Sequence, residues 1–109
     1  MSGGMIRVVR RSAWSGRIRA FKIYIDDVDH GKIRNNETKE FMVENGSHEV
    51  YIRIDFHKSQ KLPVYVDNSI VTLEASLPLA IQSNNPRLRR VSVEPLLVEA
   101  ELESEGEAI

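Results

Sequence analysis

Residues 38–56 read TKEFMVENGSHEVYIRIDF, and the fold prediction starts from this stretch. From residue 49 onward polar and apolar residues alternate, a period of two that is typical of a strand with one buried and one exposed face. Asn45-Gly46, which precedes that strand, is the strongest short-range signal for a two-residue hairpin turn of type I′, with positive φ at both positions. The stretch therefore predicts a β-hairpin whose inward side chains form the centre of the core: Phe41, Val43, Val50, Ile52, Ile54 and Phe56.

The rest of the chain predicts further short strands. Alternating residues favour strands at 5–12, 19–26, 32–34, 62–67, 70–75 and 89–93, and turn signals recur roughly every 8–12 residues. Pro63 favours an edge position or a strand start for the residues at 62–67, because proline cannot donate to a sheet ladder. No ten-residue stretch before Ser76 has a helical period of 3.6. We therefore expect an all-β fold, a single antiparallel β-sandwich of about seven strands.

Domain boundaries follow from composition. The chain has 109 residues, which fits one domain, and we place the sandwich at residues 5–94. Residues 1–4 are small and polar and predict a frayed leader. Residues 95–109 alternate glutamate with small and apolar residues, and we expect a short acidic tail that is disordered or weakly helical and mobile.

Composition also bounds the class of protein. The chain has no cysteine, which excludes disulfides and thiolate chemistry. No signal peptide and no apolar run of about 20 residues are visible, so we predict a cytoplasmic protein with no membrane span.

Charge is distributed unevenly. The formal net charge is −1, but six basic residues and no acidic ones precede Asp26, whereas five glutamates and no basic residue follow Pro95. Cations next to Trp14 and Tyr24 are the ingredients of single-stranded nucleic-acid binding. Arginine alternating with valine is equally typical of a solvated sheet face, and the pI near 6.3 lies below the range of basic nucleic-acid domains. Nucleic-acid binding is therefore an alternative, not the leading hypothesis.

Metal and catalytic motifs are weak. Asp26-Asp27-x-Asp29-His30 gathers oxygen ligands, but the spacing and the distal glutamate of an EF-hand are missing. His30, His48 and His57 have no metal-ligand spacing, and there is no nucleophile elbow or phosphate loop. We predict a turn at the aspartates, no metal, no cofactor, no catalytic residue and no enzyme activity.

Residues 19–75 resemble the PEGA-type β-domain, and more closely a group of small bacterial PEGA-like proteins of unknown function. The matching segments are Ile23-Tyr24-Ile25-Asp26, Gly31, residues 37–41 (ETKEF) and residues 46–52 (GSHEVYI). The chain departs from the family pattern at Asp26-Asp27, where Asp-Gly is usual, and at Glu44-Asn45, where prolines often occur. The resemblance implies a small β-sandwich that serves as an accessory or binding module, without catalytic residues.

We therefore expect a non-enzymatic interaction module. It would bind a protein partner, or a second copy of itself in a homodimer, through an edge strand or an exposed sheet face. The first strand and residues 62–67 are the predicted open edges. Trp14 either caps the end of the sandwich or anchors a partner. The alternative function is binding of a carbohydrate-like ligand or of single-stranded nucleic acid. The candidate binding residues are Arg7, Arg10, Arg11, Trp14, Arg19, Tyr24, Tyr51 and Arg53.

Overall fold

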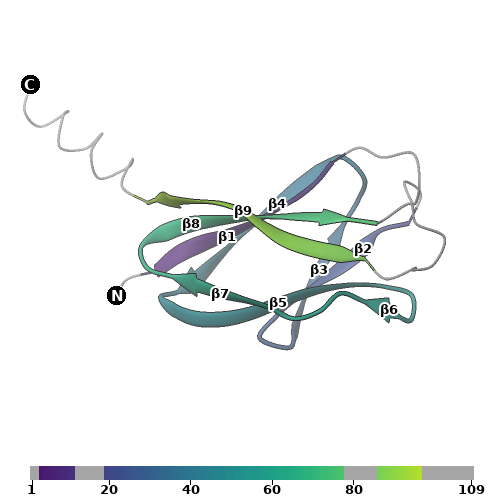
Figure 1. Cartoon of the computed structure of the whole chain (residues 1–109), viewed down its shortest axis with the longest axis horizontal. Helices are drawn as coiled ribbons and strands as arrows, with labels where there is room; N and C mark the ends of the chain where they lie inside the picture. The colour runs from purple at the N-terminus through teal and green to yellow at the C-terminus, as the bar shows by residue number, and fades with distance from the viewer. Residues whose placement is uncertain (1–2, 12–18, 78–85, 97–109) are drawn as a thin grey trace, which may run out of the picture.

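The computed structural model describes residues 3–11, 19–77 and 86–96, and all regular structure in this part is β-strand (Figure 1). The prediction of an all-β fold is confirmed for these residues. These residues form nine strands instead of about seven: β1 (Gly3–Arg10), β2 (Phe21–Ile25), β3 (Val28–Ile33), β4 (Glu37–Glu44), β5 (Gly46–Ile54), β6 (His57–Lys58), β7 (Leu62–Val66), β8 (Ser69–Ser76) and β9 (Arg87–Pro95).

The strands form two sheets that lie in two layers (Figure 1). One sheet has the order β4-β1-β8-β9; the other has the order β3-β2-β5-β6, with β7 also paired to β5. β1 and β8 run parallel, so the prediction of a purely antiparallel arrangement is wrong at this one pair. β1 is an interior strand, hydrogen-bonded to β4 and β8, and its predicted role as an open edge is therefore also wrong. In the described residues β7 pairs with β5 alone and lies at a sheet edge, where Pro63 placed it.

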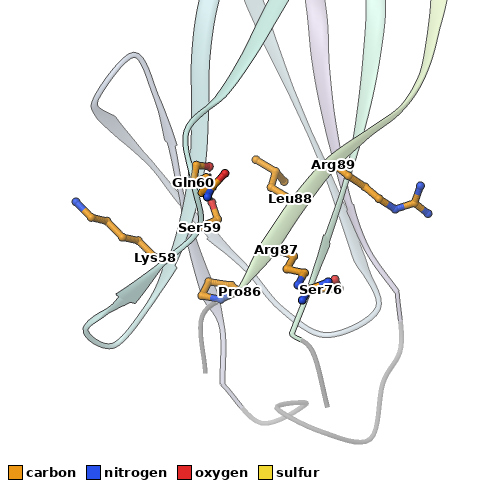
Figure 2. Close-up of a pocket in the computed structure, with 8 residues that line it drawn as sticks. All are labelled: Lys58, Ser59, Gln60, Ser76, Pro86, Arg87, Leu88 and Arg89. Carbon is orange, nitrogen blue, oxygen red and sulfur yellow. Dashed lines mark hydrogen bonds between the residues drawn. The ribbon is translucent and has the colours of Figure 1, made fainter. Parts of the chain in front are cut away.

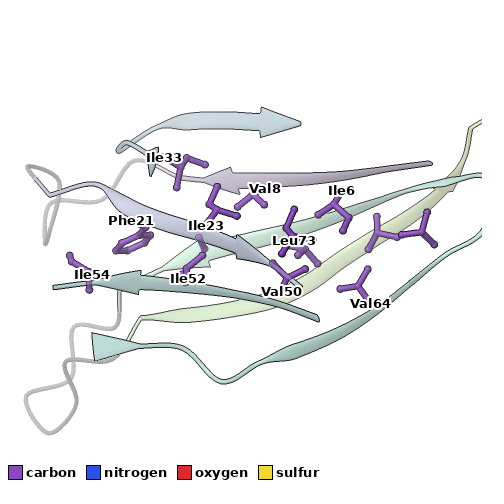
Figure 3. Close-up of a cluster of buried hydrophobic side chains, with 14 residues drawn as sticks. Ile6, Val8, Phe21, Ile23, Ile33, Val50, Ile52, Ile54, Val64 and Leu73 are labelled. Carbon is purple, nitrogen blue, oxygen red and sulfur yellow. The ribbon is translucent and has the colours of Figure 1, made fainter. Parts of the chain in front are cut away.

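Buried side chains from both sheets meet in one core (Figure 3). Val50, Ile52 and Ile54 belong to it, as the alternation predicted. Phe41 and Val43 are partly buried against its edge. The remaining members are Ile6, Val8, Phe21, Ile23, Ile25, Ile33, Val64, Val66, Val71, Leu73 and Ala75.

Phe56 is not in the core. Its side chain is 93% exposed, and the prediction that it points inward is wrong. The strand ends at Ile54, and Asp55 has a φ of 56°, which turns the chain into β6 before Phe56 can continue the alternation. Phe56 therefore lies at a turn tip.

Residues 38–56 do not form a hairpin. β4 pairs with β1 in one sheet, and β5 pairs with β2 and β7 in the other. Gly46 has a φ of 127°, but Asn45 is not among the described residues with positive φ, so the two-residue type I′ conformation is absent. Alternation favours a strand in either sheet equally, and here the chain crosses between the layers at Asn45-Gly46.

A tight hairpin occurs instead at Asp26-Asp27. Both aspartates have positive φ, 52° and 66°, the pattern of a type I′ turn, and they join β2 directly to β3. The strand predicted at 32–34 therefore begins earlier than expected, because β3 starts at Val28.

β3 carries a bulge. Lys32 pairs with Lys22 and Asp29 pairs with Tyr24, so one extra residue lies on β3 between these pairs. Gly31 has a φ of 100°, and its amide donates to the Asp29 carboxylate at 2.8 Å. In a regular strand residues 29 and 32 would face opposite sides. The bulge turns both toward the outer face.

β1 begins at Gly3, which pairs with Glu44, so residues 3 and 4 are part of the fold and not a leader. Trp14, residues 78–85 and residues 97–109 lie outside the described residues, as does most of the predicted acidic tail. No helix capable of crossing a membrane occurs in the described ranges.

Candidate functional site on the outer face of the five-stranded sheet

The predicted binding residues of β1 separate. Arg7 lies on the outer face of the four-stranded sheet and pairs with Glu40 at 2.8 Å. Arg11 pairs with Glu74, which also binds Arg89 at 2.6 Å. Hydrogen bonds from Arg11 and then Arg89 lower the pKa of Glu74. Carboxylates thus neutralise this part of the predicted surface.

Arg10 is buried, and its predicted place on a binding surface is wrong. It follows Ile6 and Val8 on the inward side of β1 and is 3% exposed. Its guanidinium donates to the carbonyl oxygens of Arg19 at 2.6 Å and Ile33 at 3.1 Å, and lies 3.8 Å from the centroid of the Phe21 ring. Burial lowers the pKa of Arg10. This arginine satisfies backbone oxygens at the end of the core.

Tyr24 and Tyr51 form a stacked pair on the outer face of the five-stranded sheet. They are direct neighbours across β2 and β5, and their ring centroids lie 4.7 Å apart with planes 5° from parallel. The inward alternation of both strands fixes this placement, because Ile23, Ile25 and Ile52 are buried on the other side. The structure therefore brings together the two predicted tyrosines.

A row of four cations crosses the same face beside the tyrosines. Lys32 pairs with Lys22, Lys22 with Arg53, and Arg53 with Lys58, so one basic residue from each of β3, β2, β5 and β6 stands in register. We call Lys22, Tyr24, Lys32, Tyr51, Arg53 and Lys58 the basic–tyrosine face.

The candidate binding residues predicted from the sequence did not include Lys22, Lys32 or Lys58; Lys22 was counted only among the six basic residues that precede Asp26. Lys32 joins the row only because of the bulge at Gly31, and Lys58 only because β5 turns back at Asp55 into the two-residue β6. The four cations of the row are spread over residues 22–58 of the sequence. Only the register of the strands shows that they stand side by side.

Few carboxylates balance the row. Lys22 is 4.0 Å from Asp29, and Arg53 donates to the backbone oxygen of Asp55 at 2.9 Å. Lys32, Arg53 and Lys58 have no salt bridge to any described residue. The face therefore carries uncompensated positive charge.

Two further groups border the face. The ammonium groups of Lys58 and Lys61 lie 5.6 and 5.9 Å from the centroid of the Tyr51 ring, within cation–π range. Lys61 also pairs with Asp27 at 3.5 Å. Arg19, another predicted residue, pairs with Asp55 at the opposite end.

Two hollows adjoin this surface. A depression of about 340 Å³ is lined by three cations of the row, Lys22, Lys32 and Arg53, together with Arg19, Ala20 and Asp55. A larger hollow of about 590 Å³ lies between β6 and β9 (Figure 2). Lys58 borders that hollow, but its side chain points away from β9 (Figure 2).

The histidines do not converge. His48 contacts Asp26 through Nδ1 and the Glu44 carbonyl through Nε2, both at 2.7 Å. His30 packs edge-on against the Phe41 ring, with centroids 5.4 Å apart, and His57 lies in β6. Within the described ranges no three His, Asp or Glu side chains are placed to hold a metal ion together.

No protein-family model, curated protein or solved structure matches the chain. The resemblance to PEGA-type domains therefore stays a prediction.

Proposed function

We propose that the protein is a non-catalytic binding module that holds an anionic macromolecule on the basic–tyrosine face. The observation that carries this proposal is the row Lys32, Lys22, Arg53 and Lys58, which stands in register across four strands. The two sheets, packed as a β-sandwich, serve as its rigid platform.

The cation row is unfavourable for the sheet by itself. Like charges directly opposite one another across strands destabilise a sheet. Residues that break a local rule without a gain in stability are expected at functional sites. An anionic partner would neutralise the row, and charge complementarity of this kind also speeds association.

The distribution of perturbed groups supports binding over catalysis. Burial lowers the pKa of Arg10 inside the core, and hydrogen bonds lower the pKa of Asp26, Glu37 and Glu74. None of these groups lines either of the two hollows described above, and neither does His48, whose pKa is raised and which contacts Asp26. Active sites gather such groups in one pocket.

Column chromatography tests the proposal with a sulfated polysaccharide as the polyanion. The face variant K22Q/K32Q/K58Q is compared with the matched variant R7Q/R11Q/R89Q, which removes three cations from the outer face of the four-stranded sheet. We expect the face variant to elute at clearly lower salt than the wild type and the matched variant to elute close to it. Equal elution of the two variants contradicts the proposal.

Self-association through β7 is a second candidate. In the described residues β7 is paired on one side only, and its Tyr65 is 64% exposed. An open edge of this kind can pair with a second copy. Light scattering at high concentration is the check, and a strict monomer contradicts this candidate.

A further inference from the structure

We infer that the anionic ligand of the basic–tyrosine face is single-stranded nucleic acid, an inference that rests on the proposed function. Single-strand binding combines cations that follow the backbone with aromatic rings on which bases stack. Both components occur here side by side, because Tyr24 and Tyr51 neighbour Lys22 and Arg53 along the same strands.

The length of the cation row suits a short single strand. Neighbouring strands lie about 4.8 Å apart, so four strands place the outer cations roughly 14 Å from each other. A stacked nucleic-acid strand carries one phosphate about every 3.4 Å, which gives a footprint of roughly four nucleotides. The row therefore matches the small end of known single-strand sites.

The stacked tyrosines distinguish nucleic acid from an acidic peptide. A carboxylate-rich peptide would use the cations but has no flat ring to extend the stack. A base does, and its contact with an aromatic ring does not depend on base identity. Because a duplex keeps its bases paired inside, the same stack favours single strands over duplex.

The charge of the whole chain does not oppose this inference. The formal net charge is −1, but residues 1–94 carry fifteen Lys and Arg against eleven Asp and Glu, a formal charge of +4. The balance is made by five glutamates after Pro95. The overall pI therefore understates the positive charge of the strands.

Fluorescence anisotropy with the full chain tests the inference. The probes are a labelled single-stranded dT12, the duplex of the same length, and polyglutamate of similar charge as a competitor. We expect dT12 to bind at 50 mM salt at least about tenfold more tightly than the duplex. We also expect polyglutamate to compete poorly.

Variants separate stacking from charge. Tyr51→Leu should weaken dT12 binding about tenfold, whereas Tyr51→Phe, which keeps the ring, should bind like the wild type. K22Q/K32Q/K58Q should reduce the slope of log affinity against log salt by about 2, since each lost phosphate contact removes about 0.7. R7Q/R11Q/R89Q should leave the slope unchanged. Circular dichroism confirms that each variant is folded.

The outcomes are distinct. Two results would overturn the nucleic-acid inference but leave an anion-binding face: dT12 affinity that is unchanged by Tyr51→Leu, or polyglutamate binding as tight as that of dT12. Polysaccharide binding without dT12 binding also overturns the nucleic-acid inference and leaves an anion-binding face. Absence of binding by all polyanions overturns both the inference and the proposed function.

Discussion

At the scale of single residues, His48 shows how one side chain joins three segments. Its two ring nitrogens face oxygen acceptors, the Asp26 carboxylate and the Glu44 carbonyl. Burial by itself lowers the pKa of His48, but the hydrogen bonds to Asp26 and Glu44 outweigh it, and the net pKa is raised. The hydrogen bond from His48 in turn lowers the pKa of Asp26. The imidazolium therefore ties the β2–β3 turn to the point where the chain crosses between sheets.

The sign of the pH dependence follows from these directions. Because the pKa of His48 is raised in the folded protein, protonation of His48 stabilises the fold. This stabilisation is fully present below the ordinary histidine pKa and is lost as the pH rises through the raised pKa. The lowered pKa of Asp26 contributes stability above the ordinary carboxyl value, which is lost as pH falls through the lowered pKa. The pair should stabilise most in mildly acidic solution.

His48→Gln should remove this pH dependence. Urea unfolding is measured at about pH 5.5 and about pH 8.5. We expect the free energy of unfolding of the wild type to be about 1 kcal/mol lower at the higher pH, the scale of a charge-assisted hydrogen bond. The variant should be less stable than the wild type at the lower pH, and its free energy of unfolding should be nearly the same at both pH values. His30→Gln is the matched control and should keep the wild-type dependence. A His48→Gln profile parallel to the wild type contradicts this account.

Arg10 shows what residue patterns leave open. Its spacing after Ile6 and Val8 indicates the inward face, whereas its charge favours the surface. Only the three-dimensional placement of the Arg19 and Ile33 carbonyl oxygens decides between the two. Tyr24, Tyr51 and Arg53, in contrast, alternate with apolar residues that are all buried, and their outward position could be predicted.

At the scale of elements, most strand ranges follow from alternation, but their membership in a sheet does not. β4 and β5 are adjacent in the chain and belong to different layers. The same period of two fits either layer, and the choice is made by non-local partners: β1 for β4, and β2 and β7 for β5. Lys32 and Lys58 could not be assigned to the cation row for the same reason, because their register depends on the bulge at Gly31 and on the turn at Asp55.

The strand β5 should dominate stability through its inward side chains. Ile52 is fully buried, and Ile52→Ala should lower the free energy of unfolding by roughly 2–5 kcal/mol. Phe56→Ala should be nearly neutral, since that side chain is 93% exposed. Urea denaturation of the two variants measures both, and a larger loss for Phe56→Ala than for Ile52→Ala would reverse the assignment of inward residues.

The bulge in β3 should depend on Gly31. A Cβ there would meet no atom within 4 Å, so the penalty of Gly31→Ala comes from its φ of 100° alone. We expect a loss of about 1 kcal/mol, together with weaker polyanion binding as Lys32 leaves the row. Gly31→Asn should lose less, because asparagine tolerates positive φ better. Unchanged stability of Gly31→Ala would contradict the expected cost of placing a side chain at this φ.

At the scale of the whole molecule, the two outer faces differ in how charge is arranged. On the four-stranded sheet Arg7 and Arg11 each face a glutamate. On the five-stranded sheet Lys32, Arg53 and Lys58 have no carboxylate partner among the described residues. The fold thus presents one neutralised face and one basic face.

The most direct test of the basic–tyrosine face is a backbone amide NMR titration of the full chain with dT12 and, separately, with the sulfated polysaccharide. We predict that the shifted amides cluster on β2, β5 and β6, around Lys22, Tyr51 and Lys58, and that those of β1, β4 and β8 stay in place. Shifts centred on the four-stranded sheet, or no shift with either polyanion, would contradict the account.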